Sequence, residues 1–460
     1  MNDFSNGFDS KALAVATEGE WLRASMPIDL RLNGVFTDTR QDGYGKLFVA
    51  LEGEKFDAHD FLDAAIAAGA VALCVTKSKQ NKIPPHCPVP VLLTEDSLVA
   101  YQAIGRLHRR KFPDLKLVGI TGSVGKTSVK EMLRAIFSFD AGEEKVLYTL
   151  GNTNNQIGVP QNLLRLTPEH RYAVIEMGTN HPGEIEPLSL CTQAQTALVN
   201  SIAPCHLEFL GSLDGVAREK SRIFCGLPPN GTAVIPADCP GIELLRQAAA
   251  PLKTLSFGEN SGDVRSHYRG GRLQGSTFDL IFPGGEHFTV NWRLAGRHQS
   301  LNAAAAAAVA LSVGVAPQTI ANGLEQTLLP GMRNKITQID GVTYFNDAYN
   351  ANPGSMQAAF EQLSEFANGQ QLILILGEML ELGAYSFDEH REIFALAKRM
   401  FPAARIATVG KEFQNAGAEH HFNTAVEAQI FVKKARRGDL VFAKGSRGIA
   451  VEMALPEEAR

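Results

Sequence analysis

Leu117-Val-Gly-Ile-Thr-Gly-Ser-Val-Gly-Lys-Thr-Ser128 is the stretch of this 460-residue chain that decides the fold of its central part. An apolar run leads into a glycine-rich turn, and a helical pattern follows directly. Glycines let the backbone curl so that its N–H groups face phosphate oxygens, and the helix N-terminus adds a favourable field. The stretch therefore predicts a β-strand, a phosphate-binding loop and a helix.

The loop contains residues that we expect to hold a nucleoside triphosphate, and MgATP is the expected ligand. Lys126 would contact the β- and γ-phosphates, and the Thr127 hydroxyl would ligate Mg²⁺. The spacing is G-x-x-G-x-x-G-K-T, and Ile120 stands where the generic pattern has glycine. A chance Gly-Lys-Thr in a strand-to-helix turn is the competing interpretation. The ATP contacts expected from the loop are Gly122, Ser123, Val124, Gly125, Lys126, Thr127 and Ser128.

Strand and helix patterns alternate on both sides of this loop. Apolar runs typical of buried strands recur with helical patterns between them, at residues 116–120, 145–149, 172–176, 196–201 and 232–236. Such alternation is typical of a parallel α/β sheet with helices on its faces. A glycine-rich, more β-like piece at 258–290 and an alanine-rich helix follow.

Two further α/β regions flank the central one. The first carries β-like and helical patterns, at residues 46–51, 58–68, 70–75, 89–93 and 95–112. The last carries expected strands separated by helices, at residues 342–346, 371–376, 405–409 and 439–443. Pro113 ends a helical pattern, and Pro330-Gly331 is a turn dipeptide. We therefore predict domains at residues 1–112, 113–331 and 332–460, and the length favours about three domains as well.

Composition and charge exclude several classes of protein. Lysine and arginine total 44 against 49 aspartate and glutamate, which argues against nucleic acid as the main partner. The longest apolar stretches, such as residues 303–313, are too short to span a bilayer, and the N-terminus lacks the apolar core of a signal peptide. The six scattered cysteines form no C-x-x-C pair, which indicates reduced thiols. We therefore expect a cytoplasmic protein without membrane insertion.

A phosphate loop needs an acid on the metal side, and Glu176 is the candidate. It ends the apolar run Tyr172-Ala-Val-Ile-Glu176, two expected strands after the loop. A carboxylate at such a strand end can ligate Mg²⁺. Taken alone, a solvated glutamate at the end of a strand explains the pattern equally well.

Polar residues follow other expected strands of the central region. Gly151-Asn-Thr-Asn-Asn-Gln-Ile-Gly-Val-Pro160 places Asn154 and Asn155 after the second strand, and His206 follows the fourth. Open α/β sheets bind ligands at the carboxyl ends of their strands. An ordinary polar loop and a structural histidine are the competing interpretations. Lys220, in a helical pattern, would by default be a solvated helix residue.

Taken together, these motifs are similar to those of the Mur ligases, the ATP-dependent amide ligases of peptidoglycan synthesis. The resemblance runs in order over essentially the whole chain, from Thr37-Asp-Thr-Arg40 to Asn346-Asp-Ala-Tyr-Asn-Ala-Asn352. The loop spacing that departs from the generic pattern is the one this family uses. Residues 346–352, followed by Gly377-Glu-Met-Leu-Glu-Leu-Gly383, most resemble the branch that adds D-alanyl-D-alanine to UDP-N-acetylmuramoyl-tripeptide.

The resemblance implies a three-domain α/β enzyme. It would have a small N-terminal α/β UDP-binding domain, a central P-loop parallel-sheet ATPase domain and a C-terminal Rossmann-like α/β domain. ATP and Mg²⁺ would be the cofactors, and UDP-MurNAc-tripeptide and D-Ala-D-Ala the small-molecule partners of a monomer. The reaction would activate the tripeptide carboxylate as an acyl phosphate, which the amine of D-Ala-D-Ala then attacks.

The resemblance also implies roles for individual residues. The peptide and UDP parts of the substrate would be held by Thr39, Arg40, Asn154 and Asn155. Further ATP contacts would come from Asn302, Arg333, Asp347 and Tyr349. Thr127, Glu176 and His206 would ligate Mg²⁺. The catalytic residues would be Lys126, His206 and Lys220, and the residue at the position of Lys220 is carbamylated in related ligases.

Two other interpretations stay open. A related ligase with another substrate, such as a folylpolyglutamate synthase, would leave the UDP-type segment 37–51 unexplained. A phosphate-loop regulatory ATPase would need neither a second substrate nor the asparagine-rich loop.

Overall fold

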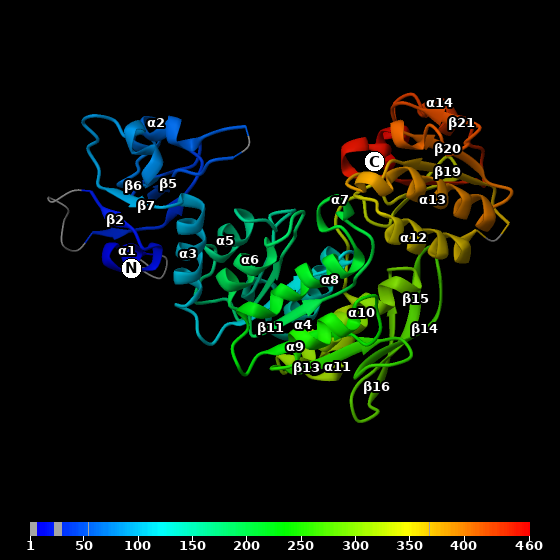
Figure 1. Cartoon of the computed structure of the whole chain (residues 1–460). Coiled ribbons are helices and arrows are strands. Elements are labelled where there is room, and N and C mark those ends of the chain that lie inside the picture. The colour runs from blue at the N-terminus through cyan, green and yellow to red at the C-terminus, as the bar shows by residue number, and fades with distance from the viewer. Residues whose placement is uncertain (1–6, 23–29, 54, 368) are drawn as a thin grey trace.

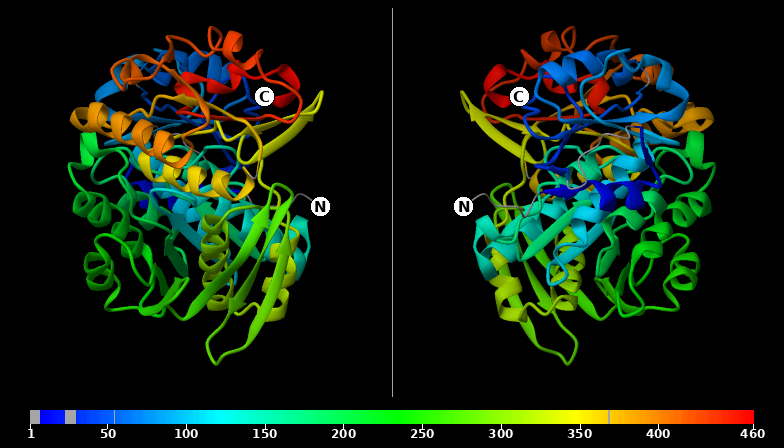
Figure 2. Two further views of the ribbon diagram at one scale, coloured as in Figure 1. Left: turned by 90° about the vertical axis from the view of Figure 1, so that its right-hand side faces the viewer. Right: turned by 90° about the vertical axis from the view of Figure 1, so that its left-hand side faces the viewer.

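The computed structural model of the chain describes residues 7–22, 30–53, 55–367 and 369–460. Within these residues the chain forms three α/β units, each built on its own larger sheet. Figure 1 shows the first unit in blue and the last in orange and red, on either side of the central unit. The side views of Figure 2 place the central unit below the other two.

The N-terminal unit contains a mostly parallel sheet with the strand order β2-β7-β6-β5-β4. The strands β4 to β7 are parallel, and β2 pairs antiparallel with β7 at the edge. The helices α1 and α3 pack on one face through Leu13 and Ile104, and α2 packs on the other through Leu62. The bounds are α1 Ser10–Thr17, β2 Glu20–Trp21, β4 Val35–Phe36, β5 Leu47–Val49, α2 Leu62–Ala67, β6 Ala72–Thr76, β7 Val91–Thr94 and α3 Ser97–Arg109. A short ladder joins β1 (Phe8–Asp9) and β3 (Arg31–Leu32).

The central unit contains a sheet with the order β16-β15-β14-β13-β12-β11-β8-β10-β9. The six strands β8 to β13 run parallel to one another, as the alternating pattern predicts. The glycine-rich piece extends the same sheet as antiparallel hairpins, so the sheet is mixed rather than purely parallel. Antiparallel strands need only short turns, whereas parallel ones need a crossover. The bounds are β8 Lys116–Thr121, β9 Val146–Tyr148, β10 Tyr172–Glu176, β11 Thr196–Val199, β12 Thr232–Pro236, β13 Lys253–Gly258, β14 Val264–Arg272, β15 Gly275–Ile281 and β16 His287–Trp292.

Helices cover both faces of the central sheet. The helices α4 (Lys126–Ala141), α10 (Arg297–Ser312) and α11 (Pro317–Glu325) share one core with it. The other core joins it to α5 (Gly158–Leu163), α6 (Ile185–Thr192), α8 (Leu213–Ser221) and α9 (Ile242–Ala249). The buried alanines of α10 allow close packing, and a Cβ on Gly323 of α11 would lie 2.5 Å from the Cα of Ile136 in α4.

The C-terminal unit contains a sheet with the order β17-β18-β22-β19-β20-β21, in which β17 alone pairs antiparallel. The helices α12 and α13 share one apolar core with this sheet, and α14 contributes to the other. The bounds are β17 Lys335–Ile339, β18 Val342–Asn346, α12 Pro353–Phe366, β19 Leu372–Gly377, α13 Ser386–Met400, β20 Arg405–Val409, β21 His420–Phe422, α14 Gln429–Val432 and β22 Leu440–Lys444. Among the described residues, no helix is both long and apolar enough to cross a membrane.

Candidate active site

The phosphate loop joins β8 to α4 and needs its glycines for steric reasons. Gly125 has a φ of +82°, in the left-handed region that favours glycine. A Cβ at this position would lie 2.4 Å from Asn200 Nδ2 and 2.5 Å from Asn302 Oδ1. Side chains of two other elements therefore close tightly around the loop, and only glycine fits between them.

Asn200 and Asn302 fix the conformation of the loop. The side chain of Asn200 donates to the Val124 carbonyl and to Asn302 Oδ1, both at 2.9 Å. On the other side, Ser123 Oγ donates to the carbonyl of Ala203 at 3.0 Å. Asn302, predicted as an ATP contact, thus lies at the loop. Asn200 is a residue that the sequence reasoning missed, although it follows directly after a buried strand.

Lys126 is the first residue of α4 and lies at the cavity. Its Nζ donates to the carbonyl of Gly122 at 2.6 Å, within the loop itself. In the described residues it forms no ion pair, so its charge is not neutralised by a carboxylate. An ammonium group held at a phosphate loop in this way is available to an anion.

Glu176 reaches the loop because β10 lies directly beside β8 in the sheet. Thr127 Oγ1 donates to Glu176 Oε2 at 3.1 Å, and Asn154 Nδ2 donates to Oε1 at 2.9 Å. The residue is only 2% exposed. Within the described part of the chain, its carboxylate has hydrogen-bond donors but no ion-pair partner. A buried carboxylate without a countercharge is costly, so this position suits a bound cation.

The donor set fits Mg²⁺ better than a softer metal. Thr127 and Glu176 offer oxygen ligands, which Mg²⁺ prefers, and this cation keeps further places for substrate phosphates and water. The described residues hold no group of three or more His, Cys, Asp or Glu side chains that could bind a metal without such help. Mg²⁺ bound by these two oxygens would need further ligands from phosphate groups or water.

His206 and Lys220 lie in the part of the central unit that follows β11. His206 precedes the short helix α7 (Leu207–Leu210), and its Nδ1 lies 2.6 Å from Glu381 Oε2 of the C-terminal unit. Lys220 in α8 is 1% exposed and does not line the cavity, so the solvated-helix interpretation is wrong. Burial lowers the pKa of its ammonium group to about 8.

The C-terminal unit brings a second set of predicted residues to the loop. Arg333 donates to Thr127 Oγ1 at 3.2 Å, and its guanidinium carbon lies 3.4 Å from the ring centroid of Tyr349. Asp347 Oδ2 accepts a hydrogen bond from Lys444 at 2.5 Å. Lys444 ends β22, beside the strand that precedes Asp347, and the sequence reasoning missed it. Burial also lowers the pKa of His298, which faces this pair, to about 4.

One cavity of about 770 Å³ collects most of the predicted site residues between the units. Its wall includes loop residues, strand-end residues of the central unit and side chains of the C-terminal unit. The predicted residues that line it are Ser123, Val124, Gly125, Lys126, Thr127, Ser128, Asn154, Asn155, Glu176, His206, Asn302, Arg333, Asp347 and Tyr349. Asn155 also binds the backbone at the start of α5, because its Oδ1 accepts from the N–H of Gly158 at 2.9 Å.

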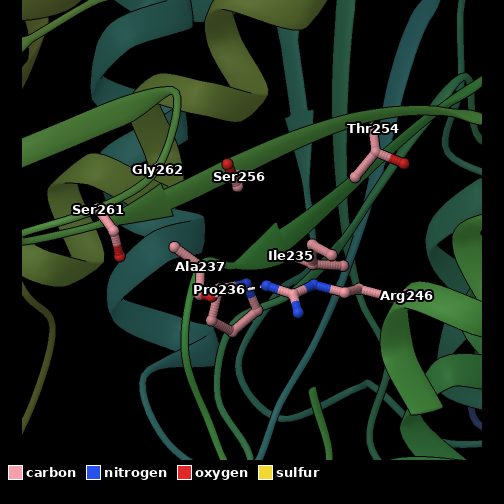
Figure 3. A pocket seen from close by; sticks show the side chains of 8 residues that line it. All are labelled: Ile235, Pro236, Ala237, Arg246, Thr254, Ser256, Ser261 and Gly262. Atoms are coloured by element: carbon pink, nitrogen blue, oxygen red, sulfur yellow. Dashed lines mark hydrogen bonds between the residues drawn. The ribbon is translucent and has the colours of Figure 1, made fainter. Parts of the chain in front are cut away.

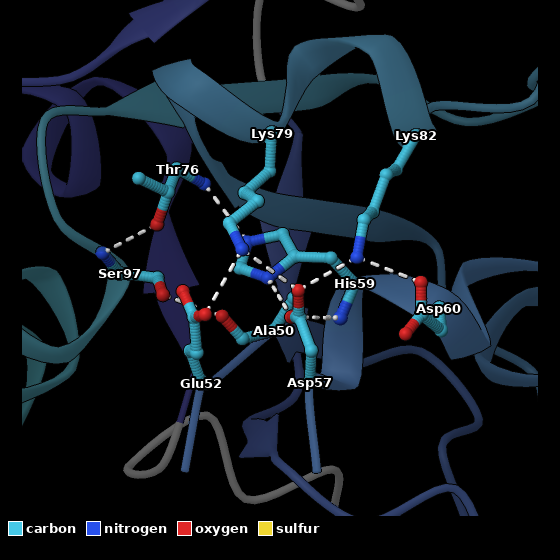
Figure 4. A network of polar contacts seen from close by, with 9 residues as sticks. All are labelled: Ala50, Glu52, Asp57, His59, Asp60, Thr76, Lys79, Lys82 and Ser97. Carbon is cyan, nitrogen blue, oxygen red and sulfur yellow. Dashed lines mark hydrogen bonds and ion pairs between the residues drawn. The ribbon is translucent and has the colours of Figure 1, made fainter. Parts of the chain in front are cut away.

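Thr39 and Arg40 lie away from this cavity, after strand β4 of the N-terminal unit. Arg40 is exposed, and its guanidinium pairs with Asp38 at 2.6 Å. The same edge of the N-terminal sheet carries a network of charged residues, shown in Figure 4. There Asp57 accepts from Lys79 at 3.0 Å and from Lys82 at 2.7 Å.

A second cavity, of about 480 Å³, lies beside β12 and β13 (Figure 3). None of the predicted site residues lines it. Its arginine, Arg246, is already engaged by Glu243 at 2.6 Å and by the carbonyl of Ala237 at 3.3 Å. The larger cavity differs from this one because Lys126 and Glu176 line it without ion pairs to described residues.

Comparison with known proteins gives the same picture over the whole chain. A family model described as the Mur ligase middle domain matches residues 120–310, and one described as the Mur ligase, glutamate ligase domain, matches residues 332–447. The UDP-N-acetylmuramoyl-tripeptide–D-alanyl-D-alanine ligase of Escherichia coli K12 is 40% identical over 441 residues, 92% of this chain and 93% of the relative.

Solved structures agree with these sequence matches. MurF from Acinetobacter baumannii superposes with a TM-score of 0.88 at 34% identity, covering 97% of this chain and 98% of that one. The MurF ligase from Thermotoga maritima, in complex with ADP, gives a TM-score of 0.80 at 25% identity, covering 91% and 95%.

Proposed function

Because the chain belongs to the Mur ligase family, in its MurF branch, we propose that it joins D-alanyl-D-alanine to UDP-N-acetylmuramoyl-tripeptide with ATP as the energy source. One observation of the structure carries the proposal. Lys126 and the buried Glu176 face one cavity at the end of a phosphate loop, and neither forms an ion pair with a described residue. Such a site gathers a triphosphate, a cation and a carboxylate substrate.

The reaction needs activation because a carboxylate is a poor electrophile. Transfer of the γ-phosphoryl group of ATP to the tripeptide carboxylate forms an acyl phosphate and releases ADP. The amine of D-Ala-D-Ala then attacks the acyl carbon, phosphate leaves, and the amine gives up its proton as the amide forms. Several anionic groups meet during these steps, so fixed positive charge lowers the barrier.

The residues of the phosphate loop hold the nucleotide. Lys126 exchanges its bond to the Gly122 carbonyl for the phosphate oxygens of ATP, and the backbone N–H groups of residues 122–128 surround those oxygens. Thr127, Glu176 and His206 would hold Mg²⁺, which would supply Lewis-acid stabilisation of the phosphate charge. Asn154 keeps the Glu176 carboxylate in place.

Lys220 carries a carbamate in this proposal. Its amine would attack CO₂, form the N–C bond and lose a proton, and only the neutral amine can do so. The lowered pKa of about 8 raises the neutral fraction near pH 7, which supports this chemistry.

The C-terminal unit closes the site over the nucleotide. Asn302 contacts ATP from the central side, Arg333 contacts it from the seam between the two units, and Asp347 and Tyr349 approach it from the C-terminal unit. Arg333 lies over the Tyr349 ring, and both side chains line the cavity. A closed site excludes the water that would hydrolyse an acyl phosphate.

The N-terminal unit holds the UDP end of the sugar substrate through Thr39 and Arg40, while Asn154 and Asn155 lie nearer the peptide end. We place the domain limits at residues 1–112, 113–331 and 332–460, since each larger sheet falls within one of these segments. The protein would act in the cytoplasm, where ATP is formed, and as a monomer whose site one chain completes.

Phosphate release tests the function directly. The purified protein should release phosphate from ATP only when both UDP-MurNAc-tripeptide and D-Ala-D-Ala are present, and mass spectrometry should find the pentapeptide product. Release that needs neither substrate would identify a regulatory ATPase. Release with a folate and glutamate instead would identify a folylpolyglutamate synthase.

A further inference from the structure

A contact between His206 and Glu381 joins the central unit to the C-terminal unit. His206 lies at the carboxyl edge of the central sheet, and Glu381 lies in the loop that follows β19. Their Nδ1 and Oε2 atoms are 2.6 Å apart, in an ion-pair geometry that departs from a linear hydrogen bond. Among the described residues, Nδ1 of His206 is buried and forms no regular hydrogen bond, and the Glu381 carboxylate is the charged group beside it.

The backbone at both residues is unusual. His206 has a φ of +50° and Glu381 a φ of +65°, in the left-handed region that non-glycine residues rarely adopt. Such conformations cost free energy and persist only where the surrounding structure holds them. Here two residues from different units are both held in this way, and their side chains meet. This coincidence indicates a built contact rather than an accidental surface pair.

The main chains around the pair are packed closely. A Cβ added to Gly383, two residues after Glu381, would lie 2.8 Å from the Cβ of Glu208. Tyr385 Oη donates to the carbonyl of Gly211 at 3.4 Å. The loop after β19 therefore docks on α7, the helix that begins directly after His206. The distance between the two side chains depends on how the two units dock.

The contact also decides which nitrogen of His206 can meet a cation. A carboxylate at Nδ1 favours the proton on that nitrogen, which leaves the lone pair on Nε2. A ligating histidine is commonly oriented by a carboxylate on its other nitrogen. Thr127, Glu176 and His206 all line the same cavity. In the proposed cation site, the orientation of the His206 ring would therefore decide whether His206 supplies the third ligand.

We propose that Glu381 is a positioning residue, which holds the His206 ring from the C-terminal unit so that the Mg²⁺ ligands are complete only when the two units are docked. The inference rests on the proposed role of His206 as a ligand. It gives the docking of the C-terminal unit a defined chemical consequence in the central unit. The loop Gly377-Glu-Met-Leu-Glu-Leu-Gly383 then acts on the cation site as well as on the fold.

Cation affinity, rather than activity, provides the test. The full-length protein is titrated with Mn²⁺ in the presence of an ATP analogue with a methylene bridge between its β- and γ-phosphates, and bound Mn²⁺ is followed by electron paramagnetic resonance. Glu381→Ala should weaken Mn²⁺ binding by about tenfold or more, the range for loss of an orienting partner. Glu381→Gln keeps an acceptor oxygen at the same reach and should retain most of the affinity.

A double-mutant cycle separates positioning from a general structural role. In a His206→Ala background, Glu381→Ala should cause no further loss of Mn²⁺ affinity, because the ring it positions is gone. Tyr385→Phe removes the neighbouring contact between the units without touching His206, and should bind Mn²⁺ as the unchanged protein does. Circular dichroism of each variant checks that it is folded.

Each outcome decides the proposal. Equal losses from Glu381→Ala with and without His206, or an equal loss from Tyr385→Phe, would overturn it in favour of general docking. Unchanged affinity in Glu381→Ala, together with weak binding in His206→Ala, would overturn the positioning role alone. Unchanged affinity in His206→Ala would overturn both this inference and the ligand role on which it rests.

Discussion

The N-terminal and central sheets both place charged side chains at the carboxyl ends of parallel strands, but the two edges differ in how these charges are paired. At the N-terminal edge Asp57 is bound by Lys79, Lys82 and the buried His59, so the charges neutralise one another (Figure 4). At the central edge Lys126 and Glu176 face one cavity without ion pairs to described residues. The same architecture thus carries a satisfied network in one unit and an incomplete site in the other.

The difference lies in what would complete each edge. His59 accepts from the N–H of Thr76 at 3.1 Å through Nε2, and its Nδ1 lies 2.6 Å from Asp57, so the chain itself satisfies both nitrogens. Glu176 is satisfied by uncharged donors only, and it remains a buried anion. Charge left without its partner is what marks a binding site, because evolution otherwise pairs or removes it.

The largest effect is expected from Lys126→Ala. It removes the loop's positive charge, so turnover should fall by at least about a hundredfold to a thousandfold, as for loss of one preorganised donor at developing charge. The thermal midpoint should hardly change, because Lys126 bonds only to its own loop. Phosphate release and differential scanning calorimetry measure the two quantities. Lys145→Ala, at the opposite end of the sheet, is the matched control, and equal activity in the two variants would contradict the comparison.

Glu176→Gln keeps the shape of the side chain and removes its charge. We expect kcat/KM to fall by about tenfold to a hundredfold, with a matching increase in the Mg²⁺ concentration needed for half-maximal rate. Stability should rise or stay unchanged, since a buried unpaired anion is removed. A loss of stability with an unchanged Mg²⁺ requirement would show that Glu176 has a structural role, like Asp57 in the N-terminal unit. Glu143→Gln, in an exposed pair with Arg134, serves as the control.

Asp57→Ala should lower the stability and leave the rate unchanged, the reverse of what we expect for Glu176→Gln. It leaves His59 Nδ1 buried without its partner, which costs about 1–3 kcal/mol of unfolding free energy. The rate at saturating substrate should stay unchanged, because the network does not line the cavity. Trp21 reports on this unit in a Trp292→Phe background, where it is the remaining tryptophan, so urea unfolding followed by its fluorescence measures the loss. A fall in kcat without a loss of stability would reverse our assignment of the two edges.

The smallest effect concerns pH. Burial raises the pKa of Asp57, but hydrogen bonds from Lys82, Lys79 and His59 outweigh it and hold the pKa well below the ordinary value. A depressed carboxylate pKa stabilises the fold above the unfolded pKa of about 3.9, and the contribution is lost as pH falls through and below that value. The unfolding midpoint reported by Trp21 should therefore decrease below about pH 4, and less so in Asp57→Ala. Parallel pH profiles in the two proteins would show that Asp57 does not contribute.

Much of the fold could be predicted from the sequence because the signals are local. The strands β10, β12, β18 and β20 have the bounds that their apolar runs predict. The polar loops after these strands indicate in the sequence where ligands bind, since the carboxyl ends of parallel strands lie at one edge of the sheet. The hairpins of β14 to β16 were expected only as a β-like piece, because their pairing with the parallel sheet depends on contacts between distant segments.

The site was predicted less completely, and the missing residues share a cause. Lys444 ends a strand of the C-terminal unit and Glu381 lies in one of its loops, and each meets a partner far away in the sequence. The signal for Lys444 was present, since the run Leu-Val-Phe-Ala-Lys444 ends a strand in a charged residue. For Glu381 no local pattern tells a contact between units from an exposed acid. The roles assigned to Lys126, Glu176 and His206 stay predictions that the variants above examine.

By itself, the sequence determined that a strand, a glycine-rich turn and a helix would follow one another, with Lys126 and Thr127 at the start of the helix, because backbone curvature is a local property. Only the tertiary structure decided that Glu176 lies beside Thr127, that Asn200 and Asn302 confine Gly125, and that Glu381 reaches His206 from another unit. Strand order and the docking of units place these side chains together, and neither is encoded in any short stretch of the chain.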